Sequence, residues 1–255
     1  MRIIISPAKK MKVDEDSLEC QGRPVFLEDT DRLLRWMQGL SREEARALWG
    51  CNEKLAEQNF RRLQEMRPER GRTPAILSYE GIQYQYMSPA VFEEEMLRYV
   101  QEHLRILSGF YGVLKPMDGV TPYRLEMQAK PVIDGVEGLY RFWGRKLYEE
   151  VTDASHVTVN LASKEYSKCI EAYLKPEDRF ITCIFGELSG DRIIQKGVYA
   201  KMARGEMVRF LAEHQITDPE EMRSFCGLGY RFREELSTDT EYIFVKTKTE
   251  QRCAL

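Results

Sequence analysis

Several signatures that would define a catalytic or metal site are missing from this sequence. The 255 residues include three histidines, and none of them belongs to an HExxH motif. A nucleophile elbow, a G-x-G-x-x-G loop and a Walker loop are also missing. Because these motifs are missing, the sequence gives no support to metalloprotease, α/β-hydrolase or dinucleotide-binding chemistry. We expect neither a bound metal nor a cofactor.

The six cysteines follow no recognisable pattern. None forms a Cys-x-x-Cys pair, and none lies at zinc-ligand spacing beside a histidine. A chain of this length can bury enough apolar surface to fold without disulfides. We therefore expect reduced thiols and a cytoplasmic protein, because disulfides are rare in the cytoplasm.

Long apolar runs are missing as well. The opening residues, MRIIISPAKK, contain an apolar run of three isoleucines, which is too short for a signal peptide or a membrane span. No linker rich in Gly, Ser or Pro, no repeat period and no low-complexity tract divides the chain. We expect one compact domain over residues 1–250 and no membrane partner.

The charges nearly balance, but they are unevenly distributed. The formal net charge is −3, so binding to nucleic-acid phosphates requires a segregated basic face. Residues 1–12 contain four cations and no acid, and residues 192–209 contain five cations and one glutamate. Folding can therefore produce a basic cleft with an acidic back. The alternative is that these charge runs are solvated helix faces.

Strand and helix patterns alternate along the chain. Residues 2–5 and 156–160 are β-branched runs that predict buried strands, and residues 198–214 predict a long helix. Another helix is predicted over residues 88–107, with Gly109 as its C-terminal stop. This alternation predicts an α/β or α+β fold, in which helices surround a mixed β-sheet.

Two segments place cations where an anion can bind. The segment ISPAKK follows a predicted strand, and strand ends in α/β sheets face crevices, so Ser6 and Lys9 are candidate ligands. Lys201 and Arg204 are three residues apart on a predicted helix and share one face, with Tyr199 beside them. Two cations and an aromatic ring suit a phosphate and a stacked base. Exposed lysines, surface cations and a core tyrosine are the alternative.

The segment HLRILSGFYGVLKPMDGVTPYRLEM combines two glycines with two cations. Gly109 and Gly112 are three residues apart, and Lys115 and Arg124 follow them. In one interpretation the glycines cap and turn the chain, while the cations are solvated. In the other, the glycines leave backbone N–H groups open to a phosphate, and Lys115 and Arg124 supply the counter-charge.

Polar residues at the ends of predicted elements are candidates for acid–base catalysis. Asn160 and Ser163 lie where a strand passes to a helix, and Glu165 lies in the first helical turn, where the helix dipole also accounts for it. Glu126 follows the Arg124 segment, and an ion pair between the two is the alternative. In an enzyme, Asn160 and Ser163 would orient the substrate, and Glu126 or Glu165 would transfer the proton.

Five blocks in order, ISPAK, LSGFYGVLKPMDGVTPYRLEM, LYRFWG, VNLASKEY and YAKMARG, resemble the YaaA family of peroxide-stress resistance proteins. The resemblance extends from Met1 to about Val245. It implies a cytoplasmic bacterial protein with a positively charged cleft that binds double-stranded DNA. It also implies a role in limiting DNA damage by hydrogen peroxide and iron, and a helix-hairpin-helix-like element near residues 92–127.

The family's binding residues carry over onto matching positions of this chain. The hairpin element matches residues 107–116, and the cleft cations match Lys9, Arg124, Lys201 and Arg204. The usual hairpin has glycines two residues apart, whereas here they are three apart, and the following VLKP is a poor second helix. Lys164 stands where an acidic residue is common in the family.

Two functions are compatible with these residues. The first is a DNA-binding protective protein that contacts phosphates through its basic cleft. The second is an enzyme that acts on a nucleotide or nucleobase in the same cleft, by cleavage of an N-glycosidic bond. A deep closed pocket favours the enzyme, and an open groove as wide as a duplex favours DNA binding.

Overall fold

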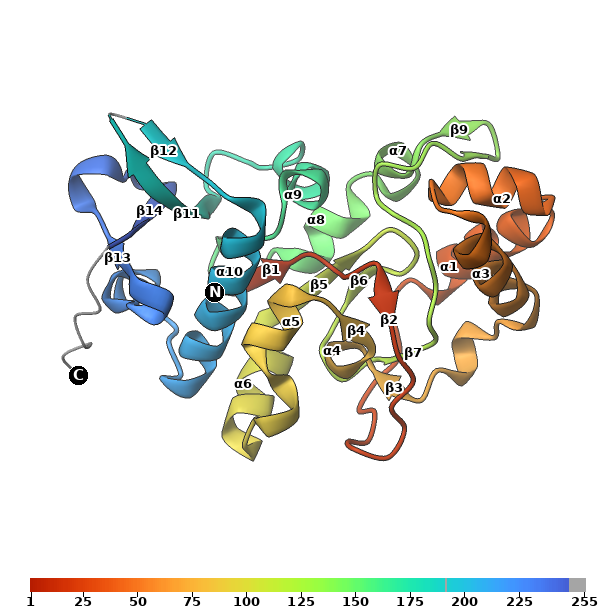
Figure 1. The fold of residues 1–255 in the computed structure, drawn as a ribbon, viewed down its shortest axis with the longest axis horizontal. Helices are drawn as coiled ribbons and strands as arrows, with labels where there is room; N and C mark the ends of the chain where they lie inside the picture. The colour runs from red at the N-terminus through yellow and green to blue at the C-terminus, as the bar shows by residue number, and fades with distance from the viewer. Residues whose placement is uncertain (191, 248–255) are drawn as a thin grey trace.

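A mixed β-sheet runs through the centre of the molecule (Figure 1). The structure is a computed structural model that describes residues 1–190 and 192–247. The sheet has the strand order β13-β14-β11-β10-β1-β5-β6, and β12 pairs with β11. These strands are β1 (Arg2–Ile5), β5 (Leu104–Ser108), β6 (Gly112–Leu114), β10 (Val157–Leu161), β11 (Arg179–Ser189), β12 (Arg192–Ile194), β13 (Tyr230–Phe232) and β14 (Glu241–Lys246).

Five of these strands are parallel, and their order defines a crevice. β1 pairs with β5 on one side and with β10 on the other, β10 pairs with β11, and β11 pairs with β14. In chain order the parallel strands lie 2-1-3-4-5, as in one common doubly wound α/β sheet. The order reverses between β1 and β10. In such sheets, ligands bind at this reversal, outside the carboxyl ends of the strands.

Burial explains why β1 is a central strand. Ile3, Ile4 and Ile5 are fully buried, and a strand between two parallel neighbours has both faces covered, which suits a continuous apolar run. β6 and β13 are antiparallel to their neighbours β5 and β14. The expected α/β fold with a mixed sheet is therefore confirmed.

The helices cover the sheet and extend it at one end. Figure 1 shows α8 and α9 above β1, β5 and β6, and α5 and α6 below them, while α1, α2 and α3 gather at the right-hand end. The helices are α1 (Leu27–Gln38), α2 (Arg42–Trp49), α3 (Glu53–Glu65), α4 (Ala75–Ser78), α5 (Ile82–Met87), α6 (Glu94–His103), α7 (Leu139–Trp143), α8 (Lys146–Val151), α9 (Lys164–Glu171) and α10 (Gly197–Glu213).

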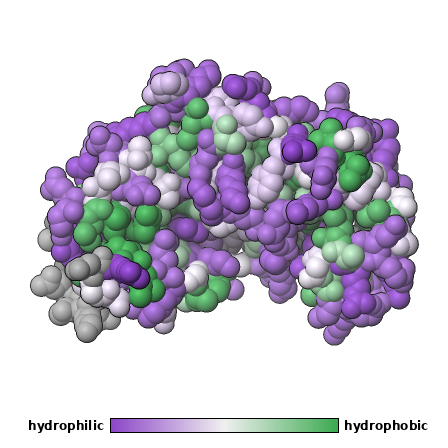
Figure 2. Space-filling view, turned by 90° about the horizontal axis from the view of Figure 1, so that it is seen from above, coloured by the Kyte–Doolittle hydropathy of each residue, from purple (hydrophilic) through white to green (hydrophobic). Residues whose placement is uncertain are grey.

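Three short strand pairs complete the described structure. They are β2 (Lys10–Met11) with β4 (Tyr79–Glu80), β3 (Thr73–Pro74) with β7 (Gly119–Val120), and β8 (Val132–Ile133) with β9 (Val136–Glu137). The buried apolar side chains form one cluster that extends from Met1 to Phe244. Figure 2 shows a largely hydrophilic surface that is indented on one side between two bulkier ends. None of the helices in the described ranges is long and apolar enough to span a bilayer.

The element near residues 92–127 is a helix followed by a β-hairpin. α6 ends at His103, and the chain continues directly into β5, which pairs antiparallel with β6 in the register Ser108↔Gly112. The predicted helix end at Gly109 is therefore wrong, and a second helix does not follow the turn. The five residues Leu104–Ser108 are all buried, and the first three of them pair with β1, so burial of both faces outweighs helix propensity.

Candidate functional site

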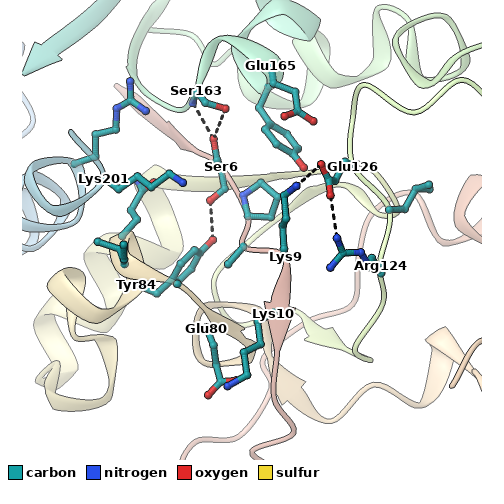
Figure 3. A pocket seen from close by; sticks show the side chains of 18 of the residues that line it. Ser6, Lys9, Lys10, Glu80, Tyr84, Arg124, Glu126, Ser163, Glu165 and Lys201 are labelled. Atoms are coloured by element: carbon teal, nitrogen blue, oxygen red, sulfur yellow. Dashed lines mark hydrogen bonds and ion pairs between the residues drawn. The ribbon is translucent and has the colours of Figure 1, made fainter. Parts of the chain in front are cut away.

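A cavity of about 390 Å³ opens at the reversal of strand order, at the carboxyl ends of β1 and β10 (Figure 3). Its walls come from the segment after β1, from β4 and α5, from residues 123–126, from the start of α9 and from α10. The cavity is lined by eight of the residues that were predicted from the sequence as site residues: Ser6, Lys9, Arg124, Glu126, Ser163, Glu165, Lys201 and Arg204. Segments that are remote along the chain therefore converge on one site.

Ser6 and Ser163 hold the floor of the cavity together. The backbone N–H of Ser163 donates to Ser6 Oγ at 2.8 Å, and the two hydroxyl oxygens lie 3.2 Å apart. Tyr84 of α5 donates its hydroxyl to the Ser6 carbonyl oxygen at 3.0 Å. Through these hydrogen bonds, Ser6 connects the end of β1 to α9 and to α5. Its contacts are therefore those of a structural residue.

One carboxylate pairs with two of the predicted cations. Lys9 Nζ lies 2.8 Å from Glu126 Oε2, and an Arg124 terminal nitrogen lies 3.5 Å from Glu126 Oε1. The side chains of Arg124 and Glu126 are largely buried, whereas the Lys9 side chain is 65% exposed. Lys10 pairs with Glu80 at 3.0 Å on the same wall (Figure 3). The positive charge on this side of the cavity is therefore largely compensated.

Glu165 is a half-buried carboxylate on the same side as Glu126. Burial raises the pKa of the Glu165 carboxyl, and the Glu126 charge raises it further, whereas the Gln128 N–H and Lys9 act in the opposite direction. The Gln128 N–H donates to Glu165 Oε1 at 3.3 Å, and no cation forms an ion pair with Glu165 in the described ranges. A carboxyl group whose pKa is raised by burial can act as a general acid.

Lys201 and Arg204 stand on α10 without counter-ions. Among residues 1–190 and 192–247, neither side chain has a hydrogen-bond or ion-pair partner. Arg204 Nε is buried and unpaired, and burial lowers the pKa of this guanidinium. Arginine is seldom buried without a partner, because an unpaired buried charge is costly. This end of the cavity is therefore suited to an anion.

Tyrosines that the sequence did not single out form part of the wall. Tyr84, Tyr123 and Tyr166 line the cavity. The Tyr123 hydroxyl lies 2.9 Å from that of Tyr79 and 2.7 Å from Ser108 Oγ, so it belongs to a buried hydrogen-bond network. No sequence pattern distinguishes these residues from ordinary core tyrosines.

The glycines of the predicted phosphate loop are explained by packing. A Cβ at Gly109 would lie 2.6 Å from the Leu125 carbonyl oxygen, and the Gly109 carbonyl accepts from Trp143 Nε1 at 3.0 Å. Gly112 has a φ of +74°, and a Cβ there would crowd Leu147 and Trp143. Both glycines lie outside the cavity lining.

Lys115, Asn160 and Tyr199 also lie outside the lining. Lys115 lines other cavities, together with Asp118 and Gln101. Asn160 is buried, accepts from the Ala162 N–H at 2.9 Å and donates to Thr182 Oγ1 at 3.2 Å, which is a structural role. Tyr199 is 41% exposed, and the Lys246 ammonium lies 4.5 Å from its ring centre.

The described parts of the chain contain no cluster of metal-ligating side chains. No group of three or more His, Cys, Asp or Glu side chains there is placed to hold a metal ion. The cavity instead offers hydroxyls, three carboxylates, the paired cations Lys9, Lys10 and Arg124, and the unpaired Lys201 and Arg204.

Comparisons with known proteins agree on one family. The family model described as "Peroxide stress protein YaaA" matches residues 1–236. A UPF0246 protein of Agathobacter rectalis is 57% identical over 244 residues, which cover 96% of this chain and 98% of the relative. UPF0246 proteins of Lachnoclostridium phytofermentans and Desulfitobacterium hafniense are each 52% identical, over 99% and 98% of this chain and 99% and 100% of theirs.

Proposed function

Since the chain belongs to the peroxide stress protein YaaA family, we propose that it is a DNA-binding protein of the peroxide stress response. In this proposal, the cavity at the ends of β1 and β10 holds a phosphate group of the nucleic acid on Lys201 and Arg204. The bound DNA is thereby protected from damage by iron and peroxide.

The unpaired Arg204 guanidinium is the observation that carries this proposal. It lines the cavity, its Nε is buried, and the described chain supplies no anion to it. Lys201 lies three residues earlier on the same helix and also lacks a carboxylate partner there. Guanidinium and ammonium groups together are suited to phosphate, since arginine binds it bidentately and lysine adds a point charge.

The dimensions of the cavity limit what enters it. A volume of about 390 Å³ is that of a small-molecule site, so it accepts a single nucleotide unit rather than a base-paired duplex. A duplex would lie across the mouth, with a backbone phosphate at Lys201 and Arg204. Phosphate contacts carry no base information, so this part of the binding should depend on salt more than on sequence.

The test is a salt titration of binding to a short DNA duplex. A lost phosphate contact lowers the magnitude of the slope of log K against log salt by about 0.9, so Lys201→Ala/Arg204→Ala should lower it by about 1 and weaken binding. The matched control is Lys54→Ala/Arg61→Ala, which removes the same charge from α3, outside the cavity. Equal affinity and slope in the cavity variant and wild type would refute the proposal.

The neighbouring carboxylates favour a second candidate function, in which the same cavity is an active site. Glu165 would give its proton to the leaving base while water adds to C1′ and passes a proton to the Glu126 carboxylate, so that the N-glycosidic bond breaks and a C1′–O bond forms. Lys9 and Arg124 pair with Glu126 and hold its carboxylate at this side of the cavity. Release of free base from DNA or nucleotides, abolished by Glu165→Gln, is the result that would establish this activity.

A further inference from the structure

We propose that the nucleotide unit accepted by the cavity carries guanine, with its two adjacent N–H donors on the Glu165 carboxylate and its phosphate on Lys201 and Arg204. This inference rests on the proposed function. It adds a base preference to a site that so far has only a phosphate end.

The two ends of the cavity differ in the charged groups that have no ion-pair partner in the described chain, which are Lys201 and Arg204 at one end and Glu165 at the other. Figure 3 shows Lys201 and Glu165 on opposite sides, with Ser6 and Ser163 between them, and Glu126 beside Glu165. A ligand that were anionic along its whole length would be repelled by the two carboxylates. A ligand that fits must therefore present an anion at one end and hydrogen-bond donors at the other.

Glu165 has unused acceptor capacity. An ionised carboxylate offers about four lone-pair directions, and the backbone N–H groups of Gln128, at 3.3 Å, and of Met127 act on two of them. The nearby Lys9 and Arg124 both pair with Glu126 instead. A half-buried carboxylate with free lone pairs and no ion-pair partner in the described ranges is suited to receive donors from a ligand.

Base chemistry selects guanine among the four standard bases. Its Watson–Crick edge presents N1–H and N2–H side by side, which matches the two oxygens of a carboxylate as a bidentate pair. Adenine and cytosine place a ring-nitrogen acceptor next to their amine, and thymine flanks its single N–H with carbonyl oxygens. Each of these three edges would bring an acceptor against Glu165.

The consequence for nucleic acid is a preference for accessible guanine. This edge of guanine is occupied in a base pair, so an intact duplex can offer its phosphates but not its bases to the cavity. Unpairing and unstacking a base costs a few kcal/mol, and this cost is smallest for mismatched or single-stranded sites. Unpaired guanines should therefore bind more tightly than paired ones.

The experiment compares the four deoxynucleoside 5′-monophosphates by titration calorimetry with the full chain. A bidentate pair discriminates by about 1–3 kcal/mol, so dGMP should bind about 5- to 150-fold more tightly than dAMP, dCMP or dTMP. Deoxyinosine monophosphate, which has N1–H but no N2 amine, should fall between dGMP and the others. Glu165→Gln should remove the preference, and Glu177→Gln, an exposed carboxylate outside the cavity, should keep it.

The outcomes separate this inference from the proposed function. Equal affinities for all four nucleotides, lost in Lys201→Ala/Arg204→Ala, would leave the phosphate site intact and overturn the guanine assignment. Persistence of the dGMP preference in Glu165→Gln would also overturn it. If wild type binds no mononucleotide, or if binding is independent of Lys201 and Arg204, the proposed function fails at this site as well. Circular dichroism of each variant shows that it has folded. Glu165→Asp keeps a carboxylate at this position and should recover part of the preference for dGMP.

Discussion

Arg204 has a partly buried guanidinium group, and the same group is placed to bind an anion in the cavity. Its Nε is shielded from solvent without a partner, while the side chain lines the cavity. A residue chosen for stability alone would not leave a guanidinium in this state, because the lost hydration is not replaced by protein hydrogen bonds. A bound anion would replace it, which makes this position informative about function.

Arg204→Met should therefore separate stability from binding. Replacing buried charge by apolar side chains of similar size is often neutral or stabilising, and we expect a gain of up to about 1 kcal/mol, or about 2–4 °C in Tm for a domain of this size. The same variant should bind DNA more weakly. Differential scanning calorimetry without ligand measures the first effect. A fall in Tm of several degrees would mean that the protein itself stabilises the guanidinium.

Glu165→Gln should change the pH dependence of stability. Burial raises the pKa of Glu165 above its ordinary value of 4.5, so the folded state holds this proton more tightly than the unfolded state does. Glu165 therefore stabilises the fold at low pH, and this contribution is lost as pH rises through the folded pKa.

At pH 7 the Tm of Glu165→Gln should then exceed that of wild type, and the difference should shrink at pH 4. Thermal melts at several pH values measure it. The exposed Glu177→Gln serves as the control for loss of a surface carboxylate. A difference that grows toward low pH would contradict the assigned direction of the shift.

At the level of elements, the contact between α5 and α10 sets the width of the cavity. Gln83 and Tyr84 of α5 and Lys201 and Arg204 of α10 all line it. Gly205 lies where the two helices cross, and a Cβ there would overlap the Gln83 carbonyl oxygen and crowd the Met87 N–H. The position of the two unpaired cations thus depends on a glycine that contacts no ligand.

Gly205→Ala should destabilise the protein by about 1–3 kcal/mol, since overpacking forces backbone shifts of this cost. Because the shift separates α5 from α10, it should also weaken DNA binding. Gly197→Ala is the matched control on the same helix, because a Cβ there meets nothing within 4 Å. Urea unfolding of both variants measures the effect. Equal stability of Gly205→Ala and wild type would show that the crossing tolerates a methyl group.

The sequence predicted those parts of the site that depend on local pattern. The apolar run before Ser6 and the β-branched run before Ser163 predicted strands, and parallel strands bring both serines to one edge of the sheet. The helical spacing of Lys201 and Arg204 predicted a shared face, and both residues line the cavity. Hydrophobic runs and helical spacing are short-range information that can be read directly from a sequence.

Predictions that depended on tertiary contacts were less successful. The apolar run from Leu104 to Leu107 follows α6 without a breaker and reads as more helix, yet it pairs with β1 as a buried strand. Short apolar runs do not distinguish buried strand from helix by periodicity alone. The prediction that Tyr199 belongs to the site relied on its nearness to Lys201 in the sequence. Residues two apart on a helix do not share a face, and the Tyr199 ring instead contacts the Lys246 ammonium.

At the scale of the whole molecule, charged groups form separate local clusters, whereas the apolar side chains form one continuous core. A net charge of −3 does not prevent a local excess of cations. Lys9 and Arg124 share Glu126, while Lys201 and Arg204 have no carboxylate partner within the described chain. The apolar core is instead continuous. Leu33, Trp49 and Leu63 of α1–α3 belong to the same buried cluster as β1 and β14.

A continuous core predicts that the chain unfolds as one cooperative unit, in keeping with the expected single domain over residues 1–250. In Trp36→Phe/Trp143→Phe, the remaining Trp49 reports on the α1–α3 end, while far-UV circular dichroism reports on the whole molecule. The two transitions should coincide in urea, because exposing Leu33, Leu63 and Trp49 alone would open the shared core. If Trp49 fluorescence changes at a clearly lower urea concentration, residues 27–65 form a separate folding unit, and the single-domain prediction is wrong.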